Sequence, residues 1–178
     1  MKAHLRTFSL SIIAILVLTL SITATSRGEN VILDEQIVAI KARCSALQAT
    51  LNQLQRNDTL QRHDNGQTYR MIMDKLMTPL NQRIASNKLD GGELVATSAA
   101  YSRAYQEFYD AYISYDQSLS DARGIDCTKQ PTRFYDQIAD AHTKRTKVYE
   151  TSSSLTMLSK QYKEQFDAFR KNLEGGAK

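Results

Sequence analysis

The sequence predicts an all-α protein, folded as an elongated antiparallel bundle of three long helical arms with coiled-coil-like packing. Apolar residues recur at alternating spacings of four and three residues over long stretches, which is the period of a helix seam. The seven glycines lie outside these stretches, where they favour helix ends and turns. After the N-terminal apolar run, no stretch has the alternation of a β-strand.

The chain begins with a basic segment followed by an uncharged one. Lys2 and Arg6 precede residues 7–26, which carry no charge and are strongly apolar at their centre. This order resembles a secretory signal peptide with cleavage after Ser26. About 20 uncharged residues also suffice to cross a bilayer, so a retained membrane anchor is the alternative. Either reading places the chain after Arg27 outside the cytoplasm, secreted or anchored at the cell envelope.

A short linker, residues 27–29, leads into a helical domain over residues 30–174, and residues 175–178 are expected to form a flexible tail. The first arm, 30–90, contains two apolar series. They comprise Leu33, Ile37, Ile40, Cys44, Leu47, Leu51 and Leu54, and then Tyr69, Met73, Leu76, Leu80 and Ile84. Asp58 and Gln61 interrupt the seam between them. Pro79 predicts a kink at Thr78, because proline lacks an N–H and crowds the preceding turn.

The second arm, 93–123, has a largely aromatic seam. Its members are Leu94, Ser98, Tyr101, Tyr105, Phe108, Tyr112, Tyr115, Leu119 and Ala122. Tyrosine has an apolar ring and a polar tip, which suits both the rim of a core and a contact surface. Core packing is the first interpretation. The alternative is a stripe that contacts a partner or a glycan, formed by Tyr101, Tyr105, Tyr109, Tyr112 and Tyr115.

The third arm, 131–174, is the longest and would extend on the order of 65 Å. Pro131 suits its first turn, where a missing N–H costs nothing. Its seam is apolar at both ends, but Arg145, Ser152 and Ser159 occupy the middle positions. Because an isolated helix gains little from propensity alone, this arm needs partners along its whole length.

Cys44 and Cys127 are the two cysteines of the chain. An extracytoplasmic location favours a disulfide between them, with two free thiols or a bridge between two chains as alternatives. The bridge would select the topology. If Asp64-Asn65-Gly66 were a reversing turn, a four-helix up-down bundle would separate the cysteines by more than ~30 Å. If the first arm passes Gly66 without reversing, the two approach each other, and a loop of about 80 residues closes, worth roughly 4 kcal/mol.

Charge and motifs exclude several classes of function. The net charge is +4, and removal of residues 1–26 leaves 23 − 2 = 21 basic residues against 19 acidic ones, or +2. That balance is too small to indicate a nucleic-acid partner. The chain lacks Glu-x-x-His, CxxCH, P-loop and GxGxxG motifs, and neither His63 nor His142 belongs to a recognisable catalytic pattern. We therefore expect no enzymatic activity, no cofactor and no metal site.

Two stretches carry a resemblance to known sequences. They are Asp126-Cys127-Thr-Lys-Gln-Pro131 with Phe134-Tyr135-Asp136, and Lys75-Leu-Met77 with Leu80-Asn81. Over about residues 40–174, the chain resembles uncharacterised, signal-bearing helical proteins of candidate-phyla (Saccharibacteria-like) bacteria. The resemblance implies a bacterial envelope location and assigns no activity and no site residues.

The sequence thus predicts a non-enzymatic extracytoplasmic protein that acts as a spacer, scaffold or interaction module at the cell envelope. We expect a protein partner or self-association, and membrane contact through residues 1–26 if they are retained. The alternative is a ligand-binding bundle whose pocket is lined by the tyrosines of residues 101–115 and by Met71, Met73 and Met77.

Overall fold

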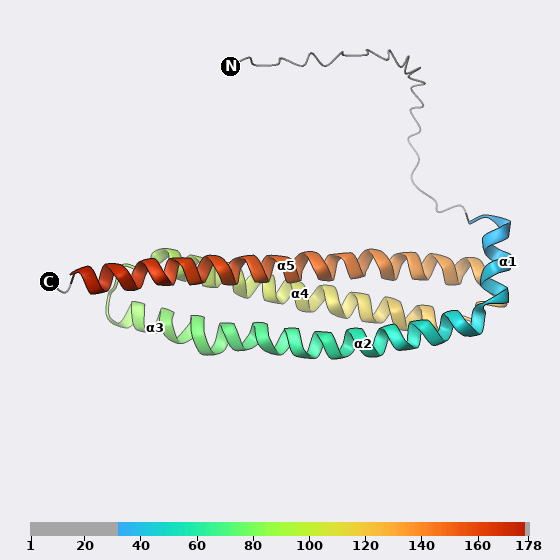
Figure 1. Cartoon of the computed structure of the whole chain (residues 1–178), viewed down its shortest axis with the longest axis horizontal. Helices are drawn as coiled ribbons and strands as arrows, with labels where there is room; N and C mark the ends of the chain where they lie inside the picture. The colour runs from blue at the N-terminus through green and yellow to red at the C-terminus, as the bar shows by residue number, and fades with distance from the viewer. Residues whose placement is uncertain (1–31, 177–178) are drawn as a thin grey trace, which may run out of the picture. The chain divides into compact units, whose positions relative to one another are not determined.

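The computed structural model describes residues 32–176, which form a bundle of three long arms (Figure 1). All elements of this part of the chain are helical, so the predicted all-α class is confirmed. The predicted signal or anchor, residues 1–26, and the linker that follows it lie outside the described residues. None of the helices described is both long enough and apolar enough to cross a membrane.

Four consecutive helical segments make up the first arm: α1 (Asp34–Ala42), α2 (Cys44–Met71), the π-helix η1 (Ile72–Met77) and α3 (Thr78–Ser86). The chain then reverses into α4 (Gly92–Gly124) and again into α5 (Pro131–Gly176). Figure 1 shows that α2 and α5 run in the same direction, with α4 antiparallel to both. The most extensive packing is between α4 and α5.

The first arm passes Gly66 as continuous helix. Gly66 lies within α2, and its Cα faces Phe108 of α4. The reversing turn that the alternative four-helix topology requires at this glycine is therefore absent from the described chain. A glycine inside a helix lowers the stability of that helix but does not by itself end it.

The bend of the first arm is at Arg43, not at the predicted Thr78. Arg43 leaves the helical region with φ −111° and ψ 12°, and α1 turns away from the direction of α2 there (Figure 1). Near Pro79 the helix continues through η1, where the N–H of Thr78 donates to the carbonyl of Met73, five residues back. This wider turn accommodates proline, which would otherwise crowd the carbonyl four residues before it.

The π-helix also shifts the face that the first arm presents to its neighbours. The sequence interpretation placed Leu76 on the seam, and this is wrong: Leu76 is 61 % exposed, whereas Met77 is fully buried. One extra residue in the turn rotates every later side chain by roughly 100°, the angular step of one residue in a helix. Tyr69, Met73 and Met77 consequently face the core in steps of four.

The reversal between α3 and α4 depends on a lysine and a glycine. Lys88 adopts a left-handed conformation, with φ 52°, and ends α3. The N–H of Leu89 bonds to the carbonyl of Ile84, and that of Lys88 to the carbonyl of Ala85, which is the Schellman pattern. A Cβ at Gly91 would lie 2.8 Å from Ile84 Cδ1, so this position requires glycine for close approach.

Apolar side chains form two core clusters along the bundle. One lies towards the disulfide and contains Leu51, Tyr112, Tyr115, Leu119, Ala122, Ile125, Cys127, Phe134 and Ala141. The other lies towards α3 and contains Met77, Ile84, Leu94, Tyr101, Ala104, Phe108, Leu155 and Tyr162. Along α5, Arg145 and Ser152 of the seam fall between Ala141 and Leu155, and Val148, which lies between them, packs against both clusters.

Candidate functional site: a buried ion pair and an apolar groove

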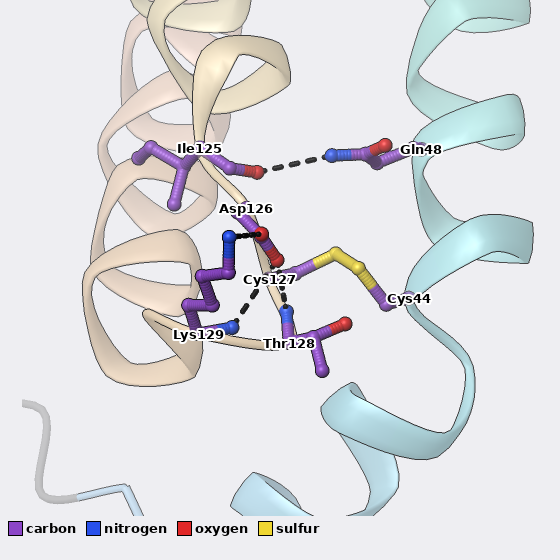
Figure 2. Close-up of a disulfide and its surroundings, with 7 residues drawn as sticks. All are labelled: Cys44, Gln48, Ile125, Asp126, Cys127, Thr128 and Lys129. Atoms are coloured by element: carbon purple, nitrogen blue, oxygen red, sulfur yellow. Dashed lines mark hydrogen bonds and ion pairs between the residues drawn. A yellow bond between two sulfur atoms is a disulfide. The ribbon is translucent and has the colours of Figure 1, made fainter.

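A disulfide closes one end of the bundle (Figure 2). Cys44 is the first residue of α2, and Cys127 lies in the loop between α4 and α5; their Cα atoms are 5.5 Å apart. The side-chain amide of Gln48 donates to the carbonyl of Ile125 at 3.0 Å and adds a second link between α2 and this loop. The disulfide therefore joins the first arm to the loop that connects the second and third arms.

The loop around Cys127 is ordered by an aspartate. The Oδ1 atom of Asp126 accepts the backbone N–H groups of Thr128, at 3.0 Å, and Lys129, at 3.2 Å (Figure 2). These bonds, led by the one from Lys129, hold the pKa of the Asp126 carboxyl below its ordinary value. Because the turn is fixed, Cys127 is held facing α2.

A bidentate ion pair joins the first and third arms at the middle of the bundle. Arg145 donates from Nε to Oδ2 and from Nη2 to Oδ1 of Asp58, both at 2.9 Å. Tyr115 of α4 donates its hydroxyl to Oδ2 of the same carboxylate at 2.5 Å. The side chain of Asp58 is 10 % exposed and that of Arg145 30 %. One carboxylate thus connects all three arms.

The protonation states of this cluster follow from its bonds. Hydrogen bonding to Asp58 raises the pKa of Arg145, so the guanidinium stays charged. Burial, followed by the bond to Asp58, raises the pKa of Tyr115, so its hydroxyl keeps its proton and remains a donor. The cluster is a charge-assisted network in which one carboxylate accepts three hydrogen bonds, two from Arg145 and one from Tyr115.

Sequence reasoning identified Asp58 and Arg145 as polar interruptions of two seams and Tyr115 as a seam residue, but it did not bring the three together. Asp58 interrupts the first arm and Arg145 the third, and their opposite charges were the available signal. Ser152, another polar residue on the seam of the third arm, also meets a side chain of the first arm: its hydroxyl lies 2.6 Å from that of Tyr69. The level at which two arms meet depends on the topology, so the partners were not assignable from seam positions alone.

A small cavity of about 80 Å³ adjoins the ion pair between α2, α4 and α5. The guanidinium of Arg62 lies 4.4 Å from the ring centroid of Tyr112, in cation–π geometry, and both side chains line the cavity. The Tyr112 hydroxyl is buried and has no hydrogen-bond partner within residues 32–176. The volume suits a few water molecules and is too small for a metabolite.

An apolar groove of about 470 Å³ lies between the first arm and α5. It is bounded by η1 and α3 on one side and by α5 on the other. Its lining residues are Ile72, Lys75, Leu76, Met77, Pro79, Leu80, Arg83, Ser159, Tyr162, Lys163 and Phe166. The volume falls in the range of small-molecule sites, about 300–1,000 Å³.

The charges of this groove have a single sign. Lys75, Arg83 and Lys163 line it, and no acidic residue does so within the described chain. Lys163 pairs with Asp167 at 2.7 Å, whereas Lys75 and Arg83 make no ion pair with any residue between 32 and 176. The site therefore combines an apolar wall with uncompensated positive charge.

The predicted tyrosine stripe is not one surface. Tyr101, Tyr112 and Tyr115 are at most 3 % exposed and belong to the core, Tyr105 is half-buried, and Tyr109 is 45 % exposed. The core interpretation therefore holds for three of the five, and the contact-stripe alternative is wrong for those three because their rings pack between the arms.

The predicted Tyr/Met pocket is also placed differently. Of Met71, Met73 and Met77, only Met77 lines the groove. The aromatic residues of the groove are Tyr162 and Phe166 of α5, not the tyrosines of residues 101–115. Met71 is 57 % exposed. As for metals, the part of the chain described here brings together no group of three or more histidine, cysteine, aspartate or glutamate side chains that could hold an ion.

Comparison of the whole chain with protein-family models, with curated proteins and with solved structures gives no match. The fold and the site geometry are therefore the basis for the functional proposal.

Proposed function

We propose that this protein is a non-enzymatic, extracytoplasmic helical module that acts as a spacer, scaffold or interaction platform at the cell envelope. The observation that carries the proposal is the disulfide between Cys44 and Cys127, which ties the three arms together at one end. Such bonds persist in oxidising compartments and are rare in the cytosol. The basic and apolar start of the chain supports the same location.

The dimensions of the bundle support the spacer role. The 46 residues of α5 correspond to roughly 70 Å of helix. Packing against α4, the ion pair of Asp58 with Arg145 and the disulfide each restrain the arms relative to one another. A bundle of this kind holds its two ends at a fixed separation.

The location is tested by the intact mass of the protein recovered from its native compartment, measured with and without reduction and alkylation. A mass that starts at Arg27, together with two alkylation sites that appear only after reduction, is the expected result for a secreted protein. A mass that retains residues 1–26 indicates an anchored one. Two thiols that react before reduction, with the protein in the cytosolic fraction, would contradict the proposal.

The interaction role is tested by photo-crosslinking in intact cells. A crosslinking amino acid at Leu60 or Met157, which are 66 % and 64 % exposed, should give an adduct of defined mass with a partner or with a second copy. The same group at fully buried Leu155 is the matched control and should give none. Absence of any adduct from a set of exposed positions on all three arms would contradict an interaction platform.

Ligand binding is the second candidate function, and the apolar groove between η1, α3 and α5 favours it. Its test is native mass spectrometry of the protein purified without detergent from its own compartment. A ligand that is retained by the wild type and lost after Leu76→Gln would support it. Leu76 lines the groove and is 61 % exposed, so this change leaves the core intact.

A further inference from the structure

We propose that the groove between the first arm and α5 binds a single-chain anionic amphiphile, a molecule with one alkyl chain and a carboxylate or similar anionic head. This inference rests on the second candidate function, ligand binding, and names its ligand class. The apolar wall accounts for the alkyl chain, and the cations that line the groove account for the head group.

The alkyl chain has a continuous apolar surface to lie on. Ile72, Met77 and Leu80 line the groove from the first arm, and Tyr162 and Phe166 line it from α5. From residue 72 to residue 83 the first arm rises by roughly 16 Å, which sets the length of the groove. Each CH₂ group transferred from water to such a surface favours binding.

The π-helix creates a feature that an alkyl chain would cover. Because η1 shifts the seam from Leu76 to Met77, Leu76 stays at the mouth of the groove with 61 % of its surface exposed. A leucine in this position leaves apolar surface in contact with water. A bound chain would remove this surface from water, and π-helical turns frequently occur at functional sites.

The anionic head is placed at one end of the groove by the register of the two arms. The hydroxyl of Tyr162 lies 3.5 Å from Oδ1 of Asn81, so these two residues are at the same level. Arg83 follows Asn81 by two residues and Lys163 follows Tyr162 by one, and both line the groove. A carboxylate at this end meets Arg83, which has no ion pair among residues 32–176, and Lys163, which also pairs with Asp167 at 2.7 Å, while Lys75 lies further along the same wall.

The size of the groove favours one molecule over a bilayer surface. A concave groove of about 470 Å³ has room for a single chain, whereas a flat membrane would contact only its rim. Association with anionic membranes is a different mode of binding, and the experiment separates the two.

The test titrates the protein, recovered from its native compartment in its oxidised form, with monomeric sodium dodecanoate and measures Kd by calorimetry. Dodecyltrimethylammonium and dodecyl maltoside are the cationic and neutral probes with the same alkyl chain. The expected result is binding of one dodecanoate per chain, with the cationic probe at least about tenfold weaker, because two attractions of the size of surface ion pairs are replaced by repulsions.

Two variants assign the binding to the groove. Arg83→Gln combined with Lys163→Gln should raise the Kd of dodecanoate by roughly fivefold to tenfold, as expected for two solvent-exposed charge contacts. The matched control is Arg103→Gln combined with Lys160→Gln, which removes two exposed cations outside the groove.

The apolar wall is tested by Leu76→Gln, which should weaken binding of dodecanoate by roughly tenfold. Leu60→Gln is its control, because Leu60 is equally exposed on the same arm but does not line the groove. Circular dichroism of each variant establishes that the helical fold is retained, as expected for changes at exposed positions.

Each outcome has a consequence. Equal affinity for the anionic and cationic probes, or no effect of the Arg83 and Lys163 changes, overturns the anionic class. A neutral or cationic native ligand that is lost with Leu76→Gln overturns the class but leaves the ligand-binding function standing. No binding of any probe and no native ligand overturn both. Binding to vesicles of phosphatidylglycerol but not to dodecanoate overturns the proposed single-molecule site and indicates association with a membrane surface.

Discussion

Removal of one partner from the ion pair between Asp58 and Arg145 should destabilise the bundle more than removal of both. Asp58→Leu leaves the Arg145 guanidinium, which is 30 % exposed, without its two bonds, and leaves the Tyr115 hydroxyl without an acceptor. Loss of one partner from a buried pair costs about 3–5 kcal/mol. Because Arg145 is partly solvated, we expect about 2–3 kcal/mol here, or a fall in Tm of about 5–10 °C.

The reciprocal change, Arg145→Met, leaves an anionic carboxylate that is only 10 % exposed, and it should cost at least as much as Asp58→Leu. In the double variant the two new apolar side chains face each other, and only the Tyr115 hydroxyl lacks a partner. We expect that variant to lose about 1 kcal/mol, since one unsatisfied buried hydroxyl then remains.

The assay is urea unfolding of the oxidised protein, followed by circular dichroism and analysed as a double-mutant cycle. The reasoning predicts a coupling free energy of at least about 2 kcal/mol between the two positions. Additive effects of the two changes, or a loss below about 0.5 kcal/mol for Asp58→Leu, would refute the assignment of this pair as a connection between the arms. The matched control is Lys147→Met, at a side chain that is 62 % exposed, and should change stability little.

Three further predictions concern the helix register, a helical glycine and the buried phenol of Tyr101. Met77→Ala should lower the free energy of unfolding in urea by about 2–5 kcal/mol, and Leu76→Ala by about 0.5 kcal/mol or less, because the π-helix buries Met77 and exposes Leu76. A larger loss for Leu76→Ala than for Met77→Ala would contradict this register. Gly66→Ala should stabilise the protein by about 0.5–1 kcal/mol in the same assay, since its Cβ would meet a ring carbon of Phe108 at 3.9 Å, an ordinary contact; a loss of stability would mean that α2 and α4 pack more closely there. Burial raises the pKa of Tyr101 to about 12. The unfolded chain releases this proton near pH 10 and the folded one about two units higher, so stability should be full below about pH 10 and fall as pH rises through that window; Tyr101→Phe should flatten the fall, measured as the urea midpoint against pH, and an unchanged slope would argue against burial of this hydroxyl.

Several features of the fold were predictable because they depend on local pattern. The seams of residues 94–122 and 134–173 repeat every three or four residues, and such periodicity requires only that one face of a helix be buried. The single long first arm followed from a geometric argument, since a bridge between Cys44 and Cys127 is incompatible with a reversal at Gly66. The structure has both the bridge and the continuous arm.

The bends of the first arm and the register of its buried side chains could not be predicted from local pattern. Pro79 was expected to kink the first arm, but a π-helical turn absorbs its ring and displaces the seam by one residue. The end of α3 was expected at a glycine, but Lys88 takes the left-handed conformation. The π-helical turn places Met77 in the core, and the turn at Lys88 brings Gly91 close to Ile84, so both features are coupled to tertiary contacts that residue type alone does not indicate.

The sequence by itself determined the helical class, the three arms, the absence of recognised catalytic motifs and which seam positions are polar, because each of these depends on residue type and spacing along one segment. Only the tertiary structure decided which polar residues meet. Asp58 and Arg145 are 87 residues apart in the chain, and their contact depends on how far two parallel arms slide past each other. The apolar groove has the same origin, since its walls and its cations come from two arms whose relative register no local pattern encodes.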